Sequence, residues 1–303
     1  MAEEPLVQIN IPKKGVGARR PPWMRVKVRE TPEYRDVARL VKELKLNTVC
    51  EEARCPNIWE CWGEHRTATF MIMGDICTRA CRYCDVTSGK PSPLDEEEPA
   101  NVAKAVSAMG LRHAVITSVD RDDLSDFGAR HWVRTIAAIR EESPDCAVEV
   151  LTPDFGGNAA ELMQVLEARP QIYSHNIETV RRLHPKMRSK GDYDRTLAVM
   201  RRAHEYRLDA GIPMTTKTGL ILGLGETLDE VLEVMDDLRG VGCDVLTMGQ
   251  YLNPTNRHAP IARFYTPEEF ESLKVEGSNR GFKHVESGPL VRSSYHAHEH
   301  VTE

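Results

Sequence analysis

Three cysteines, Cys77, Cys81 and Cys84, are spaced C-x3-C-x2-C in the segment MGDICTRACRYCDV. Three thiolates from one short loop can hold three irons of a cubane iron–sulfur cluster, which leaves the fourth iron open to a substrate or cofactor. A structural zinc ion usually takes four ligands, commonly from paired C-x2-C motifs or from C-x2-C with histidines. This segment has one C-x2-C and no histidine at zinc-finger spacing after it. The spacing therefore predicts a cluster, with zinc as the weaker alternative.

A second group of cysteines lies upstream, where TVCEEARCPNIWECWG places Cys50, Cys55 and Cys61 at C-x4-C-x5-C. This spacing suits neither one face of a helix nor a zinc knuckle, and it predicts an irregular loop around a larger ligand. Three cysteines are one short of the four that usually hold an electron-transfer cluster. The two remaining cysteines, Cys146 and Cys243, each precede a predicted strand and are expected to be small buried hydrophobes.

The composition of the 303 residues is that of a folded protein, with 41% hydrophobic and 28% charged residues. The formal net charge of −6 gives no overall basic field that would favour nucleic acid or an anionic membrane. The N-terminal MAEEPLVQIN lacks the basic and apolar regions of a signal peptide, and no apolar run approaches the roughly 20 residues of a membrane helix. We expect a cytoplasmic protein, in which a reducing environment makes metal binding a better explanation of the cysteines than disulfides.

Short apolar or β-branched runs alternate along the chain with segments of helical periodicity. The predicted strands are Thr69–Met73, Ala114–Ser118, Ala147–Leu151, Ile172–Ile177, Thr218–Leu222 and Val245–Gln250. The predicted helices are Pro99–Met109, Ala129–Glu141, Asn158–Ala168, Tyr193–Tyr206, Leu228–Leu238 and Pro267–Asn279. Two of them begin with a capping box, Thr227 with Glu230 and Thr266 with Glu269.

Strand–helix units in series predict an α/β fold with a parallel sheet and right-handed crossovers. A closed eight-unit barrel takes about 250 residues, whereas residues 67–280 provide six units. We therefore expect a partial (β/α)6 TIM-type barrel over 67–280, with a doubly wound open sheet as the alternative. Residues 1–66 are expected to form an N-terminal extension that carries the second cysteine group, and 281–303 a C-terminal extension.

Polar and charged motifs follow the predicted strands at their C-terminal ends, which in a β/α barrel is the face that carries active sites. These motifs are the Cys77 loop, TSVDRDD, TPDF, HNIET, GLGET and QYLNPT. Ser118, Asn176 and Glu226 are polar and leave strand ends on this face, so we predict that they contact a cofactor there. The glycines of GLGET are explained by a turn before the helix that Thr227 caps.

The C-x3-C-x2-C loop with an aromatic residue, Tyr83, before its last cysteine resembles the radical S-adenosylmethionine superfamily. The resemblance implies that Cys77, Cys81 and Cys84 hold a 4Fe-4S cluster whose open iron binds S-adenosylmethionine. It further implies that the reduced cluster cleaves a carbon–sulfur bond of this molecule, which yields a 5′-deoxyadenosyl radical that abstracts hydrogen. The peptide around Tyr83 would lie against the adenine.

The two cysteine groups together are similar to the lipoyl synthase family within that superfamily. The similarity covers stretches between residues 48 and 297: CEEARCPNIWECW, TATFMIMGDICTRACRYCDV, ITSVDRDDLSDFGA, EVLTPDF, HNIETVRRL, GLILGLGET, QYLNPTNRHAP and GPLVRSSYHA. It implies an auxiliary 4Fe-4S cluster held by Cys50, Cys55, Cys61 and a serine of the R-S-S-Y motif. Alignment with the motif indicates Ser294 rather than Ser293, although spacing alone does not separate the two. An oxygen ligand binds iron more weakly than a thiolate and so gives a site that can open.

The resemblance implies insertion of two sulfur atoms, at carbons six and eight of a protein-bound octanoyl-lysine, with the auxiliary cluster as sulfur donor. The implied partners are octanoylated lipoyl carrier domains, such as the E2 subunit of a 2-oxoacid dehydrogenase or the glycine cleavage H protein, and an electron donor such as ferredoxin or flavodoxin. Another two-cluster radical enzyme, such as an RNA methylthiotransferase, is the alternative. The C-x4-C-x5-C spacing and the acidic net charge count against it.

Overall fold

The computed structural model describes residues 20–26, 30–65, 67–188 and 190–295. The strands are β1 (Asn47–Thr48), β2 (Thr69–Ile72), β3 (Ile76–Cys77), β4 (Thr87–Ser88), β5 (His113–Ser118), β6 (Ala147–Leu151), β7 (Ile172–Ser174), β8 (Thr215–Leu222), β9 (Val245–Gln250) and β10 (His284–Gly288). The α-helices are α1 (Pro32–Glu43), α2 (Val49–Glu52), α3 (Ile58–Gly63), α4 (Glu98–Met109), α5 (Ala129–Glu142), α6 (Ala159–Glu167), α7 (His184–Met187), α8 (Tyr193–Asp209), α9 (Leu228–Gly240) and α10 (Pro267–Asn279). Short 3-10 helices lie at Pro22–Met24 and Phe155–Gly157.

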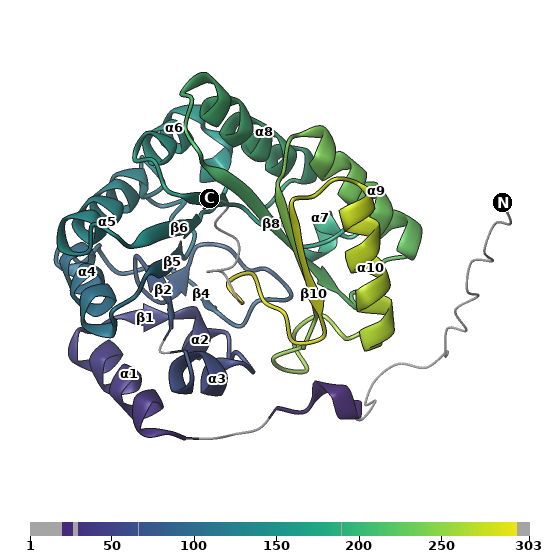
Figure 1. Cartoon of the computed structure of the whole chain (residues 1–303), viewed down its shortest axis with the longest axis horizontal. Coiled ribbons are helices and arrows are strands. Elements are labelled where there is room, and N and C mark those ends of the chain that lie inside the picture. The colour runs from purple at the N-terminus through teal and green to yellow at the C-terminus, as the bar shows by residue number, and fades with distance from the viewer. Residues whose placement is uncertain (1–19, 27–29, 66, 189, 296–303) are drawn as a thin grey trace, which may run out of the picture.

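The main sheet has eight strands in the order β1-β2-β5-β6-β7-β8-β9-β10. Every pairing from β2 to β10 is parallel, and β1 pairs antiparallel with β2. The strand order never reverses, whereas a doubly wound sheet has a point at which it does. Figure 1 shows the sheet curving like a barrel wall with the long helices outside it. The barrel-type α/β fold predicted from the sequence is confirmed, with β1 and β10 at the two ends of the strand order.

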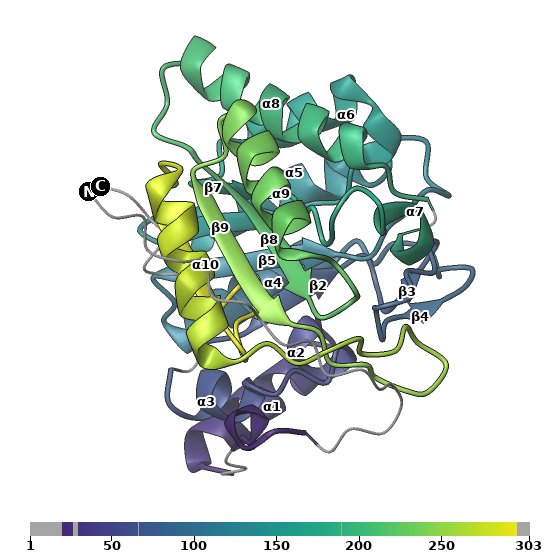
Figure 2. The same cartoon turned by 90° about the vertical axis from the view of Figure 1, so that its right-hand side faces the viewer.

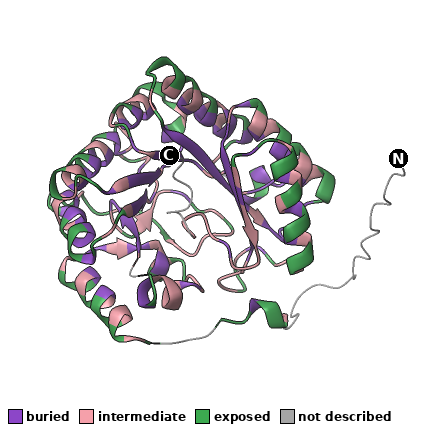
Figure 3. Cartoon of the chain, viewed as in Figure 1, coloured by how far each residue is buried: buried purple, intermediate pink, exposed green. Residues whose placement is uncertain are grey.

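The predicted strands and helices of the core are all present, with small shifts at their ends. Both capping boxes form: Thr227 and Thr266 accept the amides of Glu230 and Glu269, whose carboxylates bind the threonine amides in return. Buried residues line the sheet and the inner helix faces, and exposed residues lie on the outer helix faces (Figure 3). Helical amphipathicity therefore sets which face of each helix covers the sheet.

The segment expected to be only a C-terminal extension contributes a further parallel strand, β10, which pairs with β9. Gly281, with a φ of 83°, lets the chain turn back after α10. Only Val285 in the strand is fully buried, so no apolar run marks this strand in the sequence.

The N-terminal extension is more regular than the sequence indicates. Thr31 caps α1 by accepting the Tyr34 amide, and Pro32 occupies the first helical position. The Tyr34 ring stacks on Trp59 of α3 with 4.7 Å between centroids. Figure 2 shows α1, α2 and α3 together beneath the sheet. The cysteines of the extension therefore stand on a packed unit.

After β10 the chain turns into the space that the sheet encloses, as the end of the yellow trace in Figure 1 shows. Two glycines on neighbouring strands make room for it. A Cβ on Gly249 would lie 2.0 Å from the carbonyl oxygen of Val291, and one on Gly219 would lie 2.9 Å from the Ser293 Oγ. We call residues 289–295 the tail segment. Within the described residues, no helix is both long and apolar enough to cross a membrane.

Candidate functional site

The loop that carries Cys77, Cys81 and Cys84 leaves β2 through a sharp turn. Met73 and Gly74 have φ angles of 69° and 92°, in the left-handed region. The Met73 amide donates to the Glu98 carboxylate at 2.7 Å, and the Arg121 guanidinium donates to the Met73 carbonyl at 3.3 Å. These buried contacts stabilise an unusual conformation for methionine and fix where the loop begins.

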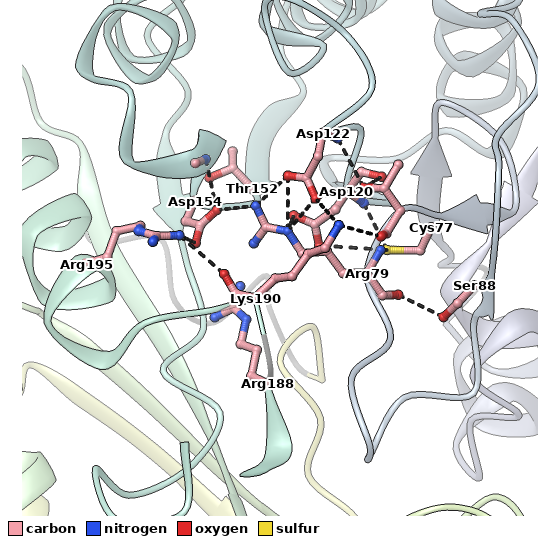
Figure 4. A network of polar contacts seen from close by, with 12 residues as sticks. Cys77, Arg79, Ser88, Asp120, Asp122, Thr152, Asp154, Arg188, Lys190 and Arg195 are labelled. Carbon is pink, nitrogen blue, oxygen red and sulfur yellow. Dashed lines mark hydrogen bonds and ion pairs between the residues drawn. The ribbon is translucent and has the colours of Figure 1, made fainter. Parts of the chain in front are cut away.

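Buried ion pairs then hold the loop in place (Figure 4). Arg79, between the first two cysteines, is 5% exposed. Its Nη2 donates to Asp122 and to Asp154, at 2.7 Å in each case. Asp154 also accepts from Arg195 at 3.0 Å, and the Arg79 carbonyl accepts from the Ser88 hydroxyl at 2.8 Å. The cysteine loop is thereby tied to the ends of two other strands, β5 and β6.

The Asp154 carboxylate is ionised in this network. Burial works to raise its pKa, but the hydrogen bonds and the charge of Arg79 outweigh burial and hold the pKa well below the usual range. Charge-assisted bonds of this kind are about twice as strong as neutral ones. The motif TSVDRDD thus serves the loop: Asp120 and Asp122 pair with Arg79, and Arg121 pairs with Asp123.

The three cysteines of the loop are half-buried, and their sulfurs receive donors. Cys77 Sγ accepts the amides of Arg79 and Asp120, at 3.4 Å each. Burial raises the pKa of Cys81 to about 11 and that of Cys84 to about 12. A thiolate here therefore needs a cation, and iron supplies that charge when it displaces the thiol proton. The donors and the burial fit an iron–sulfur cluster.

The second cysteine group lines a cavity of about 340 Å³. Cys50 lies in α2, which Thr48 caps, and Cys61 lies in α3. Between them the chain turns at Arg54, with a φ of 46°, and the Cys55 amide donates to the Cys50 carbonyl at 3.0 Å. Three cysteines separated by irregular spacing thus face one cavity.

The tail segment closes the cavity from the other end of the chain. Ser294 lines it together with Arg292 and Tyr295. Thr69 at the start of β2 donates to the Ser294 Oγ at 2.7 Å, and the Tyr295 hydroxyl donates to Glu60 at 3.0 Å. Ser293 lies elsewhere, with its hydroxyl 2.8 Å from the Asn176 amide nitrogen. The structure therefore separates two serines that spacing could not.

Electrostatics at this cavity resemble those at the first loop. Burial, with a smaller effect of Cys55, raises the pKa of Cys50 to about 12. Burial also raises the pKa of Cys55, against the charge of Arg292, which lowers it. In the part of the chain that the structure describes, no three His, Cys, Asp or Glu side chains are placed to hold a single metal ion. The ligands of a cubane cluster each bind a different iron, and three thiols with a serine oxygen at one cavity fit such a set of ligands.

Comparison with known proteins gives a consistent result. The sequence model of the radical S-adenosylmethionine superfamily matches residues 71–238, and that of the N-terminal domain of lipoyl synthase matches residues 5–55. A lipoyl synthase of Rubrobacter xylanophilus is 56% identical over 92% of this chain and 86% of that protein. The lipoyl synthase of Bacillus subtilis is 50% identical over 96% of each. The chain belongs to the lipoyl synthase family. The resemblance drawn from the sequence is confirmed, and the methylthiotransferase alternative is not favoured.

Solved structures agree on the fold. Methylornithine synthase superposes with a TM-score of 0.55 at 14% identity, over 82% of this chain and 73% of that protein. The Streptococcus suis protein SuiB, in a structure bound to S-adenosylmethionine, superposes with a TM-score of 0.54 at 11% identity, over 76% of this chain and 52% of that protein. At this identity the likeness concerns the fold alone. Membership of the radical S-adenosylmethionine superfamily implies a 4Fe-4S cluster and S-adenosylmethionine.

The residues predicted from the sequence to contact a cofactor differ in whether their polar atoms already have partners within the protein. The Ser118 Oγ and the Asn176 Oδ1 are both buried, and neither has a hydrogen-bond partner among the described residues. A buried polar atom without a partner costs free energy, so both oxygens are suited to receive a ligand. Tyr83 lies close enough to the Glu178 carboxyl and the Cys81 sulfur to interact with both.

Glu226 is held by its own turn. Its two carboxylate oxygens accept the amides of Gly223 at 2.6 Å and Leu224 at 2.9 Å. Gly223 and Gly225 have φ angles of 101° and 108°, which the turn requires. This arrangement explains the GLGET motif structurally, and the contact of Glu226 with a cofactor stays a prediction.

Sequence reasoning missed a buried ionic group at the base of the barrel. Lys217 Nζ lies 2.7 Å from Glu149 Oε1, and His113 Nε2 lies 3.1 Å from Glu149 Oε2. Burial works to raise the pKa of Glu149, but Lys217 and His113 lower it to about 2. His113 also lines the cavity of the second cysteine group. The sequence signal is a glutamate in the middle of the apolar strand β6 and a lysine just before the apolar part of β8.

Proposed function

We propose that this chain inserts two sulfur atoms, at carbons six and eight of an octanoyl group on a carrier-protein lysine. The observation that supports this most is the composition of the second cavity. It brings Cys50, Cys55 and Cys61 of the N-terminal extension together with Ser294 of the tail segment. Membership of the lipoyl synthase family supports sulfur insertion as the function of this set of ligands.

We propose two 4Fe-4S clusters per chain. Cys77, Cys81 and Cys84 would hold one, and Cys50, Cys55, Cys61 and Ser294 the other. When bound, the first supplies the electron that cleaves S-adenosylmethionine, and the second supplies the sulfur. Ser294 suits the second role, because an oxygen ligand is easier to displace from iron than a thiolate. Its present hydrogen bond to Thr69, at 2.7 Å, gives the hydroxyl a partner within the protein.

The remaining work of the chain is positioning and exclusion of water. Arg79 and its carboxylates keep the first loop rigid, which fixes where a radical forms. Ser118 and Asn176 offer buried acceptors to S-adenosylmethionine beside this loop. Cys50 is buried and Cys84 is half-buried, which would limit the access of water to a reactive intermediate. No general base is needed for hydrogen abstraction by a radical.

The partners of this reaction are proposed from the same function. The substrate would be an octanoylated lipoyl carrier domain, either of a 2-oxoacid dehydrogenase E2 subunit or of the glycine cleavage H protein. A ferredoxin or flavodoxin would reduce the first cluster. The cytoplasmic location expected from the sequence stays a prediction.

The test uses anaerobically purified protein, a reductant, S-adenosylmethionine and an octanoylated lipoyl-domain peptide. Mass spectrometry should find 5′-deoxyadenosine and a peptide that has gained two sulfurs, and analysis should find about eight irons per chain, as two cubanes require. Formation of 5′-deoxyadenosine without sulfur in the peptide would disprove sulfur insertion. A Ser294→Ala variant should form 5′-deoxyadenosine but transfer less sulfur, and Ser293→Ala should retain the iron of both sites.

A further inference from the structure

The adjacent serines of the tail segment connect it to two different sites. Ser294 lies at the cavity of Cys50, Cys55 and Cys61. Ser293 accepts a hydrogen bond of 2.8 Å from the Asn176 Nδ2, beyond the end of β7. One short stretch of chain therefore contacts both the proposed sulfur-donor cavity and the face where S-adenosylmethionine is proposed to bind.

The connection continues from Asn176 to the first cysteine loop. The same Asn176 Nδ2 lies 3.2 Å from the Glu178 carboxylate, to which it donates. The Tyr83 hydroxyl lies close enough to the Glu178 carboxyl and the Cys81 sulfur to interact with both. Hydrogen bonds thus link Glu178, Asn176 and Ser293, and Tyr83 of the first loop is the neighbour of Glu178 in this row of polar groups.

Two features indicate that the fold is built around this row of polar side chains. Gly219 faces it from β8: a Cβ there would lie 2.8 Å from the Asn176 Oδ1 and 2.9 Å from the Ser293 Oγ, closer than real Cβ atoms approach. Glu178 has a φ of 66°, a left-handed conformation that is uncommon outside glycine. Strained residues of this kind persist where surrounding contacts require them, and they cluster at functional sites.

The Asn176 amide has one polar atom, Oδ1, that these hydrogen bonds do not use. It is buried and has no hydrogen-bond partner among the described residues, so a ligand with a hydroxyl or ammonium donor can bind it. Such a donor would fix the plane of the amide. The Nδ2 of the same amide would then stay directed at the Ser293 hydroxyl.

We propose that Tyr83, Glu178, Asn176 and Ser293 form a positioning chain by which S-adenosylmethionine, bound at the first loop, holds the tail segment and so places Ser294. The inference rests on the proposed function for the identity of the ligand. Coupling between two sites is reciprocal. Binding of S-adenosylmethionine should therefore stabilise the tail segment, and loosening the tail segment should weaken binding of S-adenosylmethionine by the same factor.

The test measures hydrogen exchange of the amides of residues 290–295 in the reconstituted holoenzyme, with and without S-adenosylmethionine. In the unaltered protein, S-adenosylmethionine should slow this exchange. In Ser293→Ala the slowing should fall by about fivefold, the factor that corresponds to one neutral hydrogen bond of about 1 kcal/mol. The dissociation constant for S-adenosylmethionine, measured by equilibrium dialysis, should rise by the same factor.

The matched control is Ser272→Ala, which removes an exposed hydroxyl that donates to the Glu268 carbonyl at 3.0 Å on α10. It should leave both measurements unchanged. Gly219→Ala is a second probe, whose Cβ should separate Asn176 from Ser293 and give the same loss as Ser293→Ala.

The inference is wrong if S-adenosylmethionine does not slow exchange in the unaltered protein, or if Ser293→Ala keeps the full slowing. Failure of the proposed function gives a different result. In that case the octanoylated peptide gains no sulfur, whatever the exchange shows. Slowed exchange that depends on Ser293, without sulfur transfer, supports the positioning chain and disproves sulfur insertion.

Discussion

The two cysteine sites are built in opposite ways. The loop of Cys77, Cys81 and Cys84 takes its cysteines from one short stretch, which the buried Arg79 ties to the carboxylates of Asp122 and Asp154 at 2.7 Å. The cavity of Cys50, Cys55 and Cys61 is closed by a tail segment from the far end of the chain. That segment is held mostly by neutral bonds, such as Thr69 to Ser294 at 2.7 Å and Asn57 to the Leu290 carbonyl at 2.7 Å, with one bond to a carboxylate, from Tyr295 to Glu60 at 3.0 Å.

This difference in construction matches the difference in proposed use. A buried network of charge-assisted bonds is costly to open once one partner is removed. A neutral hydrogen bond contributes only about 1 kcal/mol. The first site is thus built to keep one geometry through each turnover, and the second can release its serine without disturbing the barrel.

The most severe way to test the contrast is to remove a ligand from each site. Cys77→Ala should abolish both 5′-deoxyadenosine formation and sulfur insertion. Cys50→Ala should abolish sulfur insertion and leave 5′-deoxyadenosine formation within about twofold. Removal of a cluster ligand should decrease activity by more than the 10–100-fold that is typical when a residue that only supports the ligands is removed. Both products are measured in one assay by mass spectrometry. Equal loss of 5′-deoxyadenosine in the two variants would mean that the sites do not work separately.

Arg79→Lys tests the rigidity of the first site. An ammonium group cannot hold two carboxylates with the planar geometry of the guanidinium, so Asp122 and Asp154 lose part of their pairing. We expect a roughly 10–100-fold decrease in 5′-deoxyadenosine formation and a changed electron paramagnetic resonance signal of the reduced first cluster. Iron at the second site should be retained.

Arg280→Lys is the matched control for this substitution, because Arg280 pairs with the exposed Asp236 at the surface. It should leave the rate unchanged. A similar decrease in both variants would show that Arg79 acts only through general stability.

Gly249→Ala tests the second site through the path of its tail segment. The new Cβ would lie 2.0 Å from the Val291 carbonyl oxygen, and overpacking of this kind costs about 1–3 kcal/mol. We expect sulfur insertion to fall by about tenfold, while 5′-deoxyadenosine formation is retained. The ratio of the two products is the measurement. Gly240→Ala is the control, since a Cβ there meets nothing within 4 Å. A parallel loss of both products in Gly249→Ala would refute a separate role of the tail segment.

The sequence predicted the core well because each element carries its own signal. Apolar runs marked the strands, and capping boxes marked α9 and α10. The helix α1 was missed although Thr31 and Pro32 form a recognisable start. Strand β10 was missed because its side chains are mostly half-buried and do not alternate.

The sites were predictable only as far as their ligands are local in sequence. Arg79 reads as a spacer between cysteines, because its partners Asp122 and Asp154 lie 43 and 75 residues away. Ser293 and Ser294 are adjacent, so spacing could not show which of them lies at the cavity of the second cysteine group. Their difference comes from the path of the tail segment past Gly249 and Gly219, which is a property of packing.

Substitutions at Glu149 and Lys217 are expected to change the difference between the two sites least. Their pairing at 2.7 Å is buried, and removal of one partner leaves an uncompensated charge. Glu149→Gln and Lys217→Met should each lower the free energy of unfolding by about 3–5 kcal/mol, and the double variant should be close to the unaltered protein. Urea unfolding at pH 7 measures this. Four equally stable proteins would show that the pair contributes nothing.

The same pair predicts a pH dependence whose sign is fixed. The pKa of Glu149 is about 2 when folded and 4.5 when unfolded, so its stabilisation is complete well above pH 4.5 and is lost as the pH falls through 4.5 towards 2. At pH 4.5 half of the unfolded carboxyls are protonated, and the advantage over Glu149→Gln should shrink by about 0.4 kcal/mol. The ratio of 5′-deoxyadenosine to inserted sulfur should stay the same in this variant, because the pair supports the barrel on which both sites stand. A changed ratio would instead show that Glu149 acts at the second cavity through His113.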